Sequence, residues 1–541
     1  MRIPCRFQSI AALVAALSLQ TNLAAEPVVM PEVAAGFEQL IERDNARAVA
    51  IGLYDNGISR FISMGRLSDI DLAPPMSDTV FEIGSISKVF TALLTQVQVD
   101  EGRLDWNTAI AEYLPEIEFA NAQIAAIRLQ ELATHTSGLP RLPDNMQFED
   151  PSDPYAGYGR DDLLAYLAAF DPESLEKSYA YSNLGAGLLG VIAAGASGKN
   201  YPTVMTTDVL NPLGLSNTHS GPRQDLVERL AVGFSSGADM SNWDGFDALA
   251  GAGALVSSVD DMVQFIEQSL DGEALGGAIR KIQASQGDGR TGLGWHLQQT
   301  DDNKTVVWHN GGTGGYASYV AIRPDNNTGV VILTTSTAYA RVTELGLQQI
   351  SGQVAPKPAV DLSPYLGAYR LDDNFVLTIF AEDGELFGQA TGQGAFPLSY
   401  TSTDRFSFAT ASIEVTFSRD ADERVNELTL LQAGTSTTAP RVDESLGVQR
   451  RAEIAIEAEV LRQYAGRYQL TPNAVISVES RNDQMYVTLT GQPSYPVFAF
   501  APDKFFYRVV DAELHFEKDD DAQVVAVVLH QQGQQRAPRI D

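Results

Sequence analysis

The chain has 541 residues and a formal net charge of −32, from 37 basic and 69 acidic side chains. This length predicts two to four domains. A hydrophobic content of 44% is ample for buried cores and excludes a disordered chain. The strongly acidic balance argues against nucleic acid or an anionic membrane as a partner.

The N-terminus has the pattern of a secretory signal peptide. Arg2 and Arg6 precede an apolar core over residues 10–19, and the small residues 23–25 follow it. That core is shorter than the roughly 20 residues that a membrane span needs, and no later run is long and apolar enough for one. We therefore expect a cleaved leader over residues 1–25 and a periplasmic or secreted protein.

Metal and thiol chemistry are not expected in the mature chain. Cys5 is the only cysteine and lies within the leader, which excludes disulfides, thiolate metal sites and cysteine catalysis. His219, His296, His515 and His530 show no ligand spacing, so we expect no metal and no cofactor.

A serine and a lysine form the first chemical motif. A strand-like run over residues 79–83 reaches Gly84, and a helical pattern follows. Ser85 and Lys88 lie three residues apart, which places both side chains on one face of that helix. An amine there can take the proton of the hydroxyl, which makes Ser85 a candidate nucleophile. A solvated lysine one turn after a capping serine would show the same pattern, so the motif alone does not decide.

Two later segments carry further candidates. Tyr181 and Asn183 lie in a turn that opens a helix, and His309 to Gly312 follow a strand over residues 305–308. Taken singly, Tyr181 would be a packed phenol and His309 an ordinary strand histidine. We expect His135 to be structural, with a hydrogen bond to a turn.

The C-terminal part is an internal repeat behind a proline-spaced linker over residues 355–359. Tyr365 and Phe417 recur 99 residues later as Tyr464 and Phe516, and the intervening matches share that register. Short alternating runs separated by turns predict a closed antiparallel barrel of about eight strands in each copy. The expected boundaries are residues 361–445 and 458–541.

Together the three motifs resemble the serine β-lactamase and penicillin-binding-protein superfamily, in its class C-like branch. The resemblance covers about residues 49–333 and includes further landmarks in the family's order: Leu132–Pro140, Gly251–Ser258, Asp260–Met262 and Gly292–Trp295. It implies an α/β (α+β) catalytic domain over residues 26–355, with an antiparallel sheet flanked by helices and an all-α lobe. The two-barrel layout resembles the D-aminopeptidase subgroup of peptidase family S12, with lipocalin-like barrels.

The resemblance implies a role for each candidate. Ser85 would be acylated, while Lys88 and Tyr181 would share the proton transfers, and which of them is the primary base stays open. Asn183 would donate a hydrogen bond to the substrate amide. The other expected substrate-binding or oxyanion-hole residues are His309, Gly311 and Gly312.

Position 309 departs from the lysine that many relatives use to bind a substrate carboxylate. A histidine offers a weaker, switchable charge, which favours peptidases or esterases over efficient antibiotic hydrolysis. The expected partner is a small molecule or short peptide, namely a D-residue peptide or amide, an ester or a β-lactam. A β-lactamase or penicillin-binding protein, a catalytically silent binding or sensor protein, and a homo-oligomer stay open as alternatives.

Overall fold

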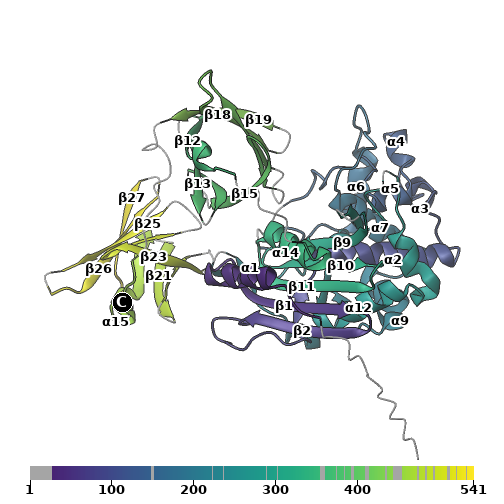
Figure 1. Ribbon diagram of the computed structural model, residues 1–541, viewed down its shortest axis with the longest axis horizontal. Coiled ribbons are helices and arrows are strands. Elements are labelled where there is room, and N and C mark those ends of the chain that lie inside the picture. The colour runs from purple at the N-terminus through teal and green to yellow at the C-terminus, as the bar shows by residue number, and fades with distance from the viewer. Residues whose placement is uncertain are drawn as a thin grey trace, which may run out of the picture.

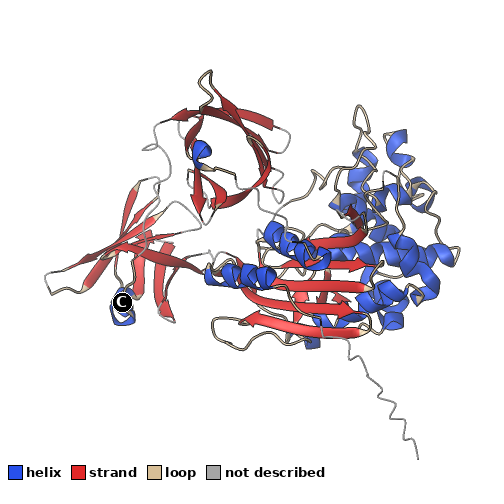
Figure 2. Ribbon diagram, viewed as in Figure 1, coloured by secondary structure: helices blue, strands red, loops and turns tan. Residues whose placement is uncertain are grey.

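The computed structural model describes most of the chain from residue 27 onward. Figure 1 shows a large α/β domain and two β sheets from the C-terminal part of the chain, and Figure 2 shows that helices gather in the first of these bodies. The predicted fold class is thereby confirmed. The predicted leader (1–25) and linker (355–359) lie outside the described residues. These residues are 27–147, 152–221, 223–235, 237–287, 289–300, 303–353, 360–372, 375–382, 384–391, 395–408, 413–432, 435–442, 454–471, 474–481, 484–490, 494–507, 512–519, 521–531 and 533–541.

A six-stranded antiparallel sheet forms the centre of the α/β domain. Its strands are β1 (Ala46–Asp55), β2 (Ile58–Gly65), β8 (His296–Gln299), β9 (Thr305–Gly312), β10 (Ala317–Arg323) and β11 (Thr328–Ser336). Their order is β2-β1-β11-β10-β9-β8, so the first strands of the domain pair with its last, and Ile51 lies opposite Ile332. The sequence predicted that His309 follows a strand, whereas β9 continues through Gly312 and carries the histidine itself.

Helices cover both faces of this sheet. They are α1 (Pro31–Glu42), α2 (Ser87–Asp100), α3 (Ile110–Tyr113), α4 (Ala122–Ala125), α5 (Leu129–Ala133), α6 (Arg160–Ala169), α7 (Asn183–Ala196), α8 (Tyr201–Met205), α9 (Asn211–Leu213), α10 (Gln224–Val227), α11 (Ala250–Gly253), α12 (Val259–Asp271), α13 (Ala278–Gln283) and α14 (Tyr339–Ser351). Helices α1 and α14 pack on one face and α12 on the other. Strand side chains alternate between the two faces of a sheet. Val49 and Ile51 therefore lie in the hydrophobic core under α1 and α14, and Ala48 and Ala50 lie in the core under α12.

Helix α2 is buried on almost every side, against α7, α11 and α13. Its polar side chains are satisfied inside the protein. Thr91 donates to the carbonyl of Gly251 at 2.8 Å, and Gln98 donates to that of Ala193 at 2.9 Å. A helix buried in this way gives the residues at its N-terminus a rigid support.

The short strands β3 (Val80–Glu82), β4 (His219–Ser220) and β7 (Leu255–Ser258) form a three-stranded sheet in the order β3-β7-β4. A separate hairpin consists of β5 (Gly233–Ser235) and β6 (Ala238–Met240).

The first C-terminal sheet is a closed barrel, as predicted. Its eight strands are β12 (Gly367–Asp372), β13 (Phe375–Glu382), β14 (Glu385–Ala390), β15 (Ala395–Ser402), β16 (Arg405–Phe408), β17 (Ile413–Arg419), β18 (Val425–Gln432) and β19 (Thr435–Val442). β12 closes on β19 through Ala368 and Val442.

The second C-terminal sheet repeats this arrangement behind helix α15 (Ala458–Tyr464). Its strands are β20 (Gly466–Thr471), β21 (Ala474–Arg481), β22 (Gln484–Leu489), β23 (Ser494–Ala501), β24 (Lys504–Tyr507), β25 (Glu513–Lys518), β26 (Val524–His530) and β27 (Gln534–Pro538). Equivalent strands begin 99 residues apart in seven of the eight pairs, as at Gly367 and Gly466. We expected this copy to be a closed barrel too, but in the described part of the chain its first and last strands, β20 and β27, do not form a ladder. β20 instead contacts the chain after β27 through an isolated bridge between Tyr468 and Arg539.

The second C-terminal sheet contacts the α/β domain. The Tyr486 hydroxyl on β22 donates to Asp69 at 3.4 Å, and β23 lies against β6. In the part of the chain that the structure describes, no helix has the length and hydropathy needed to cross a membrane.

Candidate active site

Ser85 lies on a short 3₁₀ turn, η1 (Gly84–Ile86), between β3 and α2. The predicted order of strand, glycine and helix is therefore confirmed. Gly84 has φ +49°, a conformation that side-chain-bearing residues rarely adopt, so glycine here allows the turn that presents Ser85.

Lys88 lies beside Ser85, one turn into the buried helix. Its Nζ is 3.0 Å from Ser85 Oγ and donates a hydrogen bond to the carbonyl oxygen of Ala252 at 2.7 Å. The residue is 3% exposed, so the solvated lysine that the motif alone would have allowed is not what the fold contains.

The surroundings of Lys88 favour its neutral form. Burial, followed by the positive charge of Arg141, lowers the pKa of Lys88 well below its ordinary value. A neutral amine can donate to Ala252 and still offer its lone pair to the Ser85 proton. The electrostatics thus support Lys88 as the base.

Tyr181 completes the cluster from the loop before α7. Its ring centroid is 4.8 Å from Lys88 Nζ, and the hydroxyl interacts with the Ser85 hydroxyl. Burial raises the pKa of Tyr181, and this effect outweighs the interaction with Ser85, which lowers it. The phenol therefore stays protonated at neutral pH and can donate or relay a proton.

The N-terminus of α7 holds this loop in place. The Ser182 hydroxyl caps the helix by accepting from Gly185 N–H at 2.9 Å. Ser182 N–H donates to His135 Nδ1 at 3.2 Å, and the His135 ring lies 4.4 Å from that of Tyr181. The expectation that His135 hydrogen-bonds a turn is confirmed, and its ring also supports Tyr181.

Asn183 is buried at the same helix start. Its Nδ2 donates to the Tyr155 hydroxyl at 3.0 Å, whereas its Oδ1 has no hydrogen-bond partner among the described residues. The sequence predicted Asn183 as a donor to substrate. In this arrangement Nδ2 is already bonded, and the atom left to bind a substrate is Oδ1, which accepts hydrogen bonds.

Gly312 presents its backbone N–H toward the turn that carries Ser85. Thr313 N–H donates to the carbonyl oxygen of Tyr316 at 3.0 Å, so these two residues form a hydrogen-bonded pair of the antiparallel ladder. Hydrogen-bonded and non-hydrogen-bonded pairs alternate, so the next pair, Gly312 and Ala317, is not hydrogen-bonded, and the Gly312 N–H points away from β10. A Cβ on Gly84 would lie 2.7 Å from this nitrogen. Such an approach suits an oxyanion hole between the N–H groups of Ser85 and Gly312.

At Gly311, β9 lies directly against Ile83, the residue between β3 and the turn that carries Ser85. A Cβ at this position would lie 2.0 Å from the carbonyl oxygen of Ile83, which already accepts a hydrogen bond from the Ser318 hydroxyl at 2.9 Å. Only glycine permits this contact without movement of the backbone.

We therefore expect Gly311→Ala to lower kcat by about 10²- to 10³-fold, because it displaces the adjacent N–H of Gly312. Steady-state kinetics and a thermal melt would check this. Gly195→Ala is the matched control, since Gly195 is helical and, apart from the backbone of its own helix, no atom lies within 4 Å of the added Cβ. Wild-type kcat in a correctly folded Gly311→Ala protein would contradict the assignment.

His309 is buried in β9 and does not supply a positive charge. Burial is the main reason that its pKa lies well below the ordinary value, and the same cause lowers that of His296 to about 4. His309 Nδ1 lies 2.5 Å from the carbonyl oxygen of Asn310, which can only accept, so Nδ1 carries the proton. Its Nε2 is then an acceptor, without a partner among the described residues. The switchable charge that the sequence predicted is not available near neutral pH.

Sequence reasoning missed several residues around the cluster. The ring centroid of Tyr155 lies 4.6 Å from that of Phe246, on which it stacks, and 5.4 Å from that of Trp243. These three rings form an aromatic wall beside Asn183. Arg141 places its guanidinium 5.2 Å from the Tyr181 centroid. It directly follows the landmark that ends at Pro140, which was the available signal.

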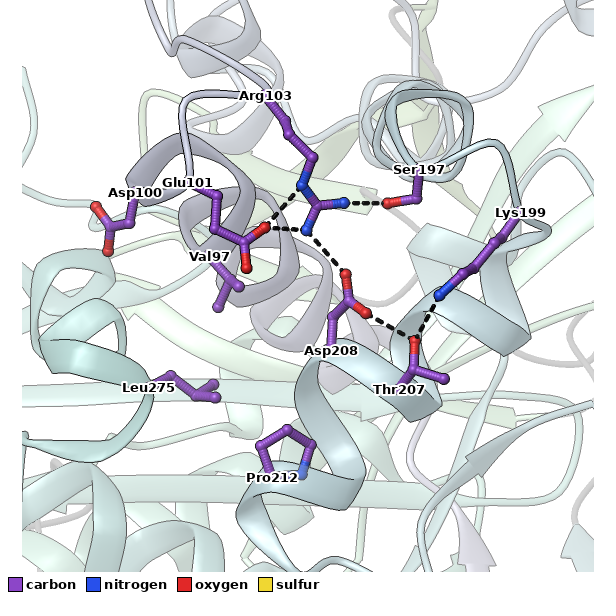
Figure 3. A pocket seen from close by; sticks show the side chains of 10 residues that line it. All are labelled: Val97, Asp100, Glu101, Arg103, Ser197, Lys199, Thr207, Asp208, Pro212 and Leu275. Atoms are coloured by element: carbon purple, nitrogen blue, oxygen red, sulfur yellow. Dashed lines mark hydrogen bonds and ion pairs between the residues drawn. The ribbon is translucent and has the colours of Figure 1, made fainter.

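A separate pocket of about 560 Å³ lies at the far end of α2 (Figure 3). At 1.5 Å per residue, Asp100 is about 18 Å along the helix from Lys88. Arg103 in this pocket is paired with Glu101 and Asp208, and Lys199 donates to Thr207. These charges are satisfied within the protein, so the pocket is not our candidate site. No three His, Cys, Asp or Glu residues are grouped to hold a metal in the described segments.

The Beta-lactamase family model matches residues 33–351, and the model named Domain of unknown function (DUF3471) matches residues 352–446 and again 450–538. The double match agrees with the repeat seen in the sequence.

Curated relatives include carboxypeptidases and penicillin-binding proteins. D-alanyl-D-alanine-carboxypeptidase/endopeptidase AmpH of Escherichia coli (strain K12) is 26% identical over 356 residues, covering 61% of this chain and 91% of that protein. Penicillin-binding protein 4* of Bacillus subtilis (strain 168) is 25% identical over 430 residues, covering 71% and 93%. Among solved structures, the class C beta lactamase from Rhodobacter sphaeroides aligns with a TM-score of 0.51 and 26% identity, over 59% of this chain and 97% of that one.

Proposed function

Because this chain belongs to the Beta-lactamase family of serine hydrolases, we propose that it is an exported hydrolase that acts through an acyl-enzyme on Ser85. Its substrates are amides or peptides that contain D-residues, or esters. The observation that carries the proposal is the 3.0 Å approach of the buried Lys88 amine, whose pKa burial lowers, to the Ser85 hydroxyl, with Tyr181 beside both.

The proposed reaction has two steps, acylation of Ser85 and hydrolysis of the acyl-enzyme, and the same groups transfer protons in both. Lys88 takes the Ser85 proton as Oγ attacks the carbonyl carbon, and the oxyanion forms between the N–H groups of Ser85 and Gly312. Tyr181 donates its proton to the leaving atom as the bond to it breaks, and the protonated Lys88 returns a proton to Tyr181, so both groups are restored. Water then attacks the acyl carbon while Lys88 takes its proton, and this proton goes to Ser85 Oγ as the acyl bond breaks, which releases the acid and restores Ser85.

The neutral charge of His309 supports the choice of substrate class. A lysine on β9 would offer a permanent cation to a β-lactam carboxylate, whereas His309 Nε2 offers a lone pair. The aromatic wall of Tyr155, Trp243 and Phe246 suits an apolar substituent next to the reacting carbonyl.

A second candidate function is that of a β-lactamase or penicillin-binding protein. The names of the relatives favour it, since they include a Beta-lactamase of Pseudomonas fluorescens, 26% identical over 334 residues. The absence of a cation at position 309 makes it the less supported of the two.

A panel of three substrates tests the proposal: a D-alanine anilide, a short-chain nitrophenyl ester and a chromogenic cephalosporin. We expect turnover of the anilide or the ester, slow cephalosporin hydrolysis, and an acyl adduct on the peptide that contains Ser85 when quenched samples are analysed by mass spectrometry. Rapid cephalosporin turnover would select the second candidate. No turnover of any of the three, with no adduct on Ser85, would refute both.

A further inference from the structure

Glu82 is a buried carboxyl group beside the nucleophile turn that the proposed reaction does not use. It is the last residue of β3, three positions before Ser85, and it is 4% exposed. Its Oε1 accepts the backbone N–H of Trp243 at 2.7 Å, whereas its Oε2 has no hydrogen-bond partner among the described residues. Burying a carboxyl oxygen without a hydrogen bond costs stability, and a role in function would account for this cost.

The segment that Glu82 binds is irregular. Residues 241–246 form neither helix nor strand, and they lie at least partly exposed. Two of their backbone N–H groups are bound by buried carboxyl groups, that of Trp243 by Glu82 and that of Gly245 by Asp153 at 2.7 Å. Since no ladder of hydrogen bonds fixes this segment, its position depends on the two acidic side chains.

The same segment places two rings of the aromatic wall beside the catalytic groups. The Trp243 indole lies over the turn after β9, because a Cβ on Gly314 would be 2.7 Å from its Nε1. A Cβ on Gly253 would lie 3.1 Å from Phe246 Cζ and 4.0 Å from the carbonyl carbon of Gly84 in η1. The wall thus extends from the oxyanion strand to the nucleophile turn, where a reacting carbonyl would be bound.

The surroundings of Glu82 favour its uncharged form up to neutral pH. Burial raises the pKa of Glu82 to about 7, and the carboxyl groups of Asp153 and Asp244 act in the same direction. The Thr313 side chain and the Trp243 N–H act in the opposite direction, but burial outweighs them. The proton of this group therefore leaves within the range in which the enzyme is expected to work.

Neutral side chains face the carboxyl group from the turn after β9 and from α14. Thr313 Oγ1 is buried and has no hydrogen-bond partner among the described residues, so it can accept the proton of an uncharged Glu82. Burial, followed by the Glu82 charge, raises the pKa of Tyr316 and Tyr339, so both phenols stay protonated. Neither of them titrates in the range of Glu82.

Resting on the proposed function, we propose that Glu82 is a positioning residue for the aromatic wall, and that its uncharged form sets how well the site accepts an aromatic substituent on the substrate. The carboxyl group holds the backbone of Trp243, which presents its ring to the site. Ionisation draws water to the buried oxygens, and residues 241–246 are the part that moves to admit it, because β3 and η1 are packed in the core. Selectivity for an aromatic group therefore decreases as Glu82 loses its proton.

Two ester pairs measure this selectivity, because the wall can contact a substituent on either side of the scissile bond. One pair enlarges the acyl group, from 4-nitrophenyl acetate to 4-nitrophenyl phenylacetate. The other enlarges the alcohol, from methyl acetate to benzyl acetate. The measured quantity is the ratio of kcat/KM for the aromatic ester over the small one, in which the contributions of Lys88 and of the oxyanion hole cancel.

Wild type should lose selectivity on the alkaline side of the Glu82 pKa. From about pH 6 to about pH 8.5 we expect the ratio to fall by about 3- to 10-fold in at least one pair, the size of one aromatic contact, while the small ester keeps a level profile. Glu82→Gln cannot ionise but still offers an oxygen to the Trp243 N–H, so it should keep the high ratio at both pH values. Glu82→Leu lacks the acceptor and should show the low ratio at both.

Asp261→Asn is the matched control. Asp261 is a buried carboxyl group on α12 that also accepts a backbone N–H, that of Asn217 at 2.8 Å, and burial raises its pKa as well. Its variant should keep both the wild-type ratio and its pH dependence. A purely structural role of Glu82 would lower the melting temperature of Glu82→Leu without any titration of the ratio in wild type.

Tryptophan fluorescence follows the wall without turnover. The difference between each protein and its Trp243→Phe variant isolates Trp243 among the four tryptophans. We expect a transition near pH 7 in wild type that is absent from Glu82→Gln.

The outcomes separate this inference from the proposed function. A wild-type ratio that is independent of pH in both pairs, an equal pH dependence in Glu82→Gln, or no fluorescence transition in wild type would overturn the inference alone. No turnover of any ester, with no fluorophosphonate label on Ser85, refutes the proposed function, and the selectivity proposed for Glu82 falls with it.

Discussion

Ser85→Ala is expected to abolish covalent adduct formation and to lower turnover by about 10⁵-fold or more, a loss typical of removing a nucleophile. Among the described residues, Lys88 Nζ is hydrogen-bonded to Ser85 Oγ and to the carbonyl of Ala252, so no other serine or threonine hydroxyl lies beside it to replace Ser85. Labelling with a fluorophosphonate, followed by peptide mass spectrometry and steady-state kinetics, measures both effects.

Ser87→Ala is the matched control, since Ser87 lies two residues away in the same motif. Its Oγ accepts the N–H of Leu255 at 3.0 Å inside the core, so its loss should lower the melting temperature and leave labelling intact. Undiminished labelling of Ser85→Ala would contradict the assignment of the nucleophile.

Lys88→Met should lower kcat/KM by about 10²- to 10⁴-fold, which is the usual contribution of a general base. Methionine keeps most of the volume of the buried chain and removes only the amine. The side chain is buried in the wild type and burial disfavours its charged form, so folding should survive, with a modest change from the lost bond to Ala252. Kinetics and a thermal melt on the same sample separate the two effects.

The pH profile identifies Lys88 as the base. The base form of Lys88 exists above its pKa, so wild-type activity should be level through neutral to mildly alkaline pH and should fall tenfold per unit below that pKa. Because burial lowers this pKa, the plateau extends below the range of an ordinary lysine. Tyr181 adds no alkaline limb there, since its pKa is raised.

In Lys88→Met the acidic limb should disappear, apart from charging of His296, whose pKa is about 4. Undiminished wild-type activity at pH 4, or an unchanged acidic limb in Lys88→Met, would argue that another group accepts the Ser85 proton. Tyr181→Phe would then be the next variant to compare.

The role of the C-terminal sheets is less direct than that of the cluster. Equivalent strands in the two copies begin almost uniformly 99 residues apart, so neither copy carries a long insertion that the other lacks. Near the end of β25, the acidic side chain of Glu517 is engaged locally, because it pairs with Arg536 at 2.7 Å. The second sheet instead meets the α/β domain through Tyr486 and β23.

Local pattern was sufficient for much of the fold and for the parts of the site that lie close together in sequence. The strand, glycine and helix around Ser85 are set by short-range geometry, because i and i+3 residues of a helix share a face whatever surrounds them. The repeat of 99 residues needed only self-comparison. The alternation of β1 between two cores follows from the period of a strand.

Only the tertiary structure decided the charges and the long-range partners. The pKa values of Lys88 and His309 are lowered because distant segments bury these side chains, and no local motif predicts that burial. Arg141 meets Tyr181 because its carbonyl caps α7, a contact between loops forty residues apart. The sequence by itself determined which groups could react, and the packing of remote elements determined their protonation and their neighbours, since desolvation and proximity are properties of the folded chain alone.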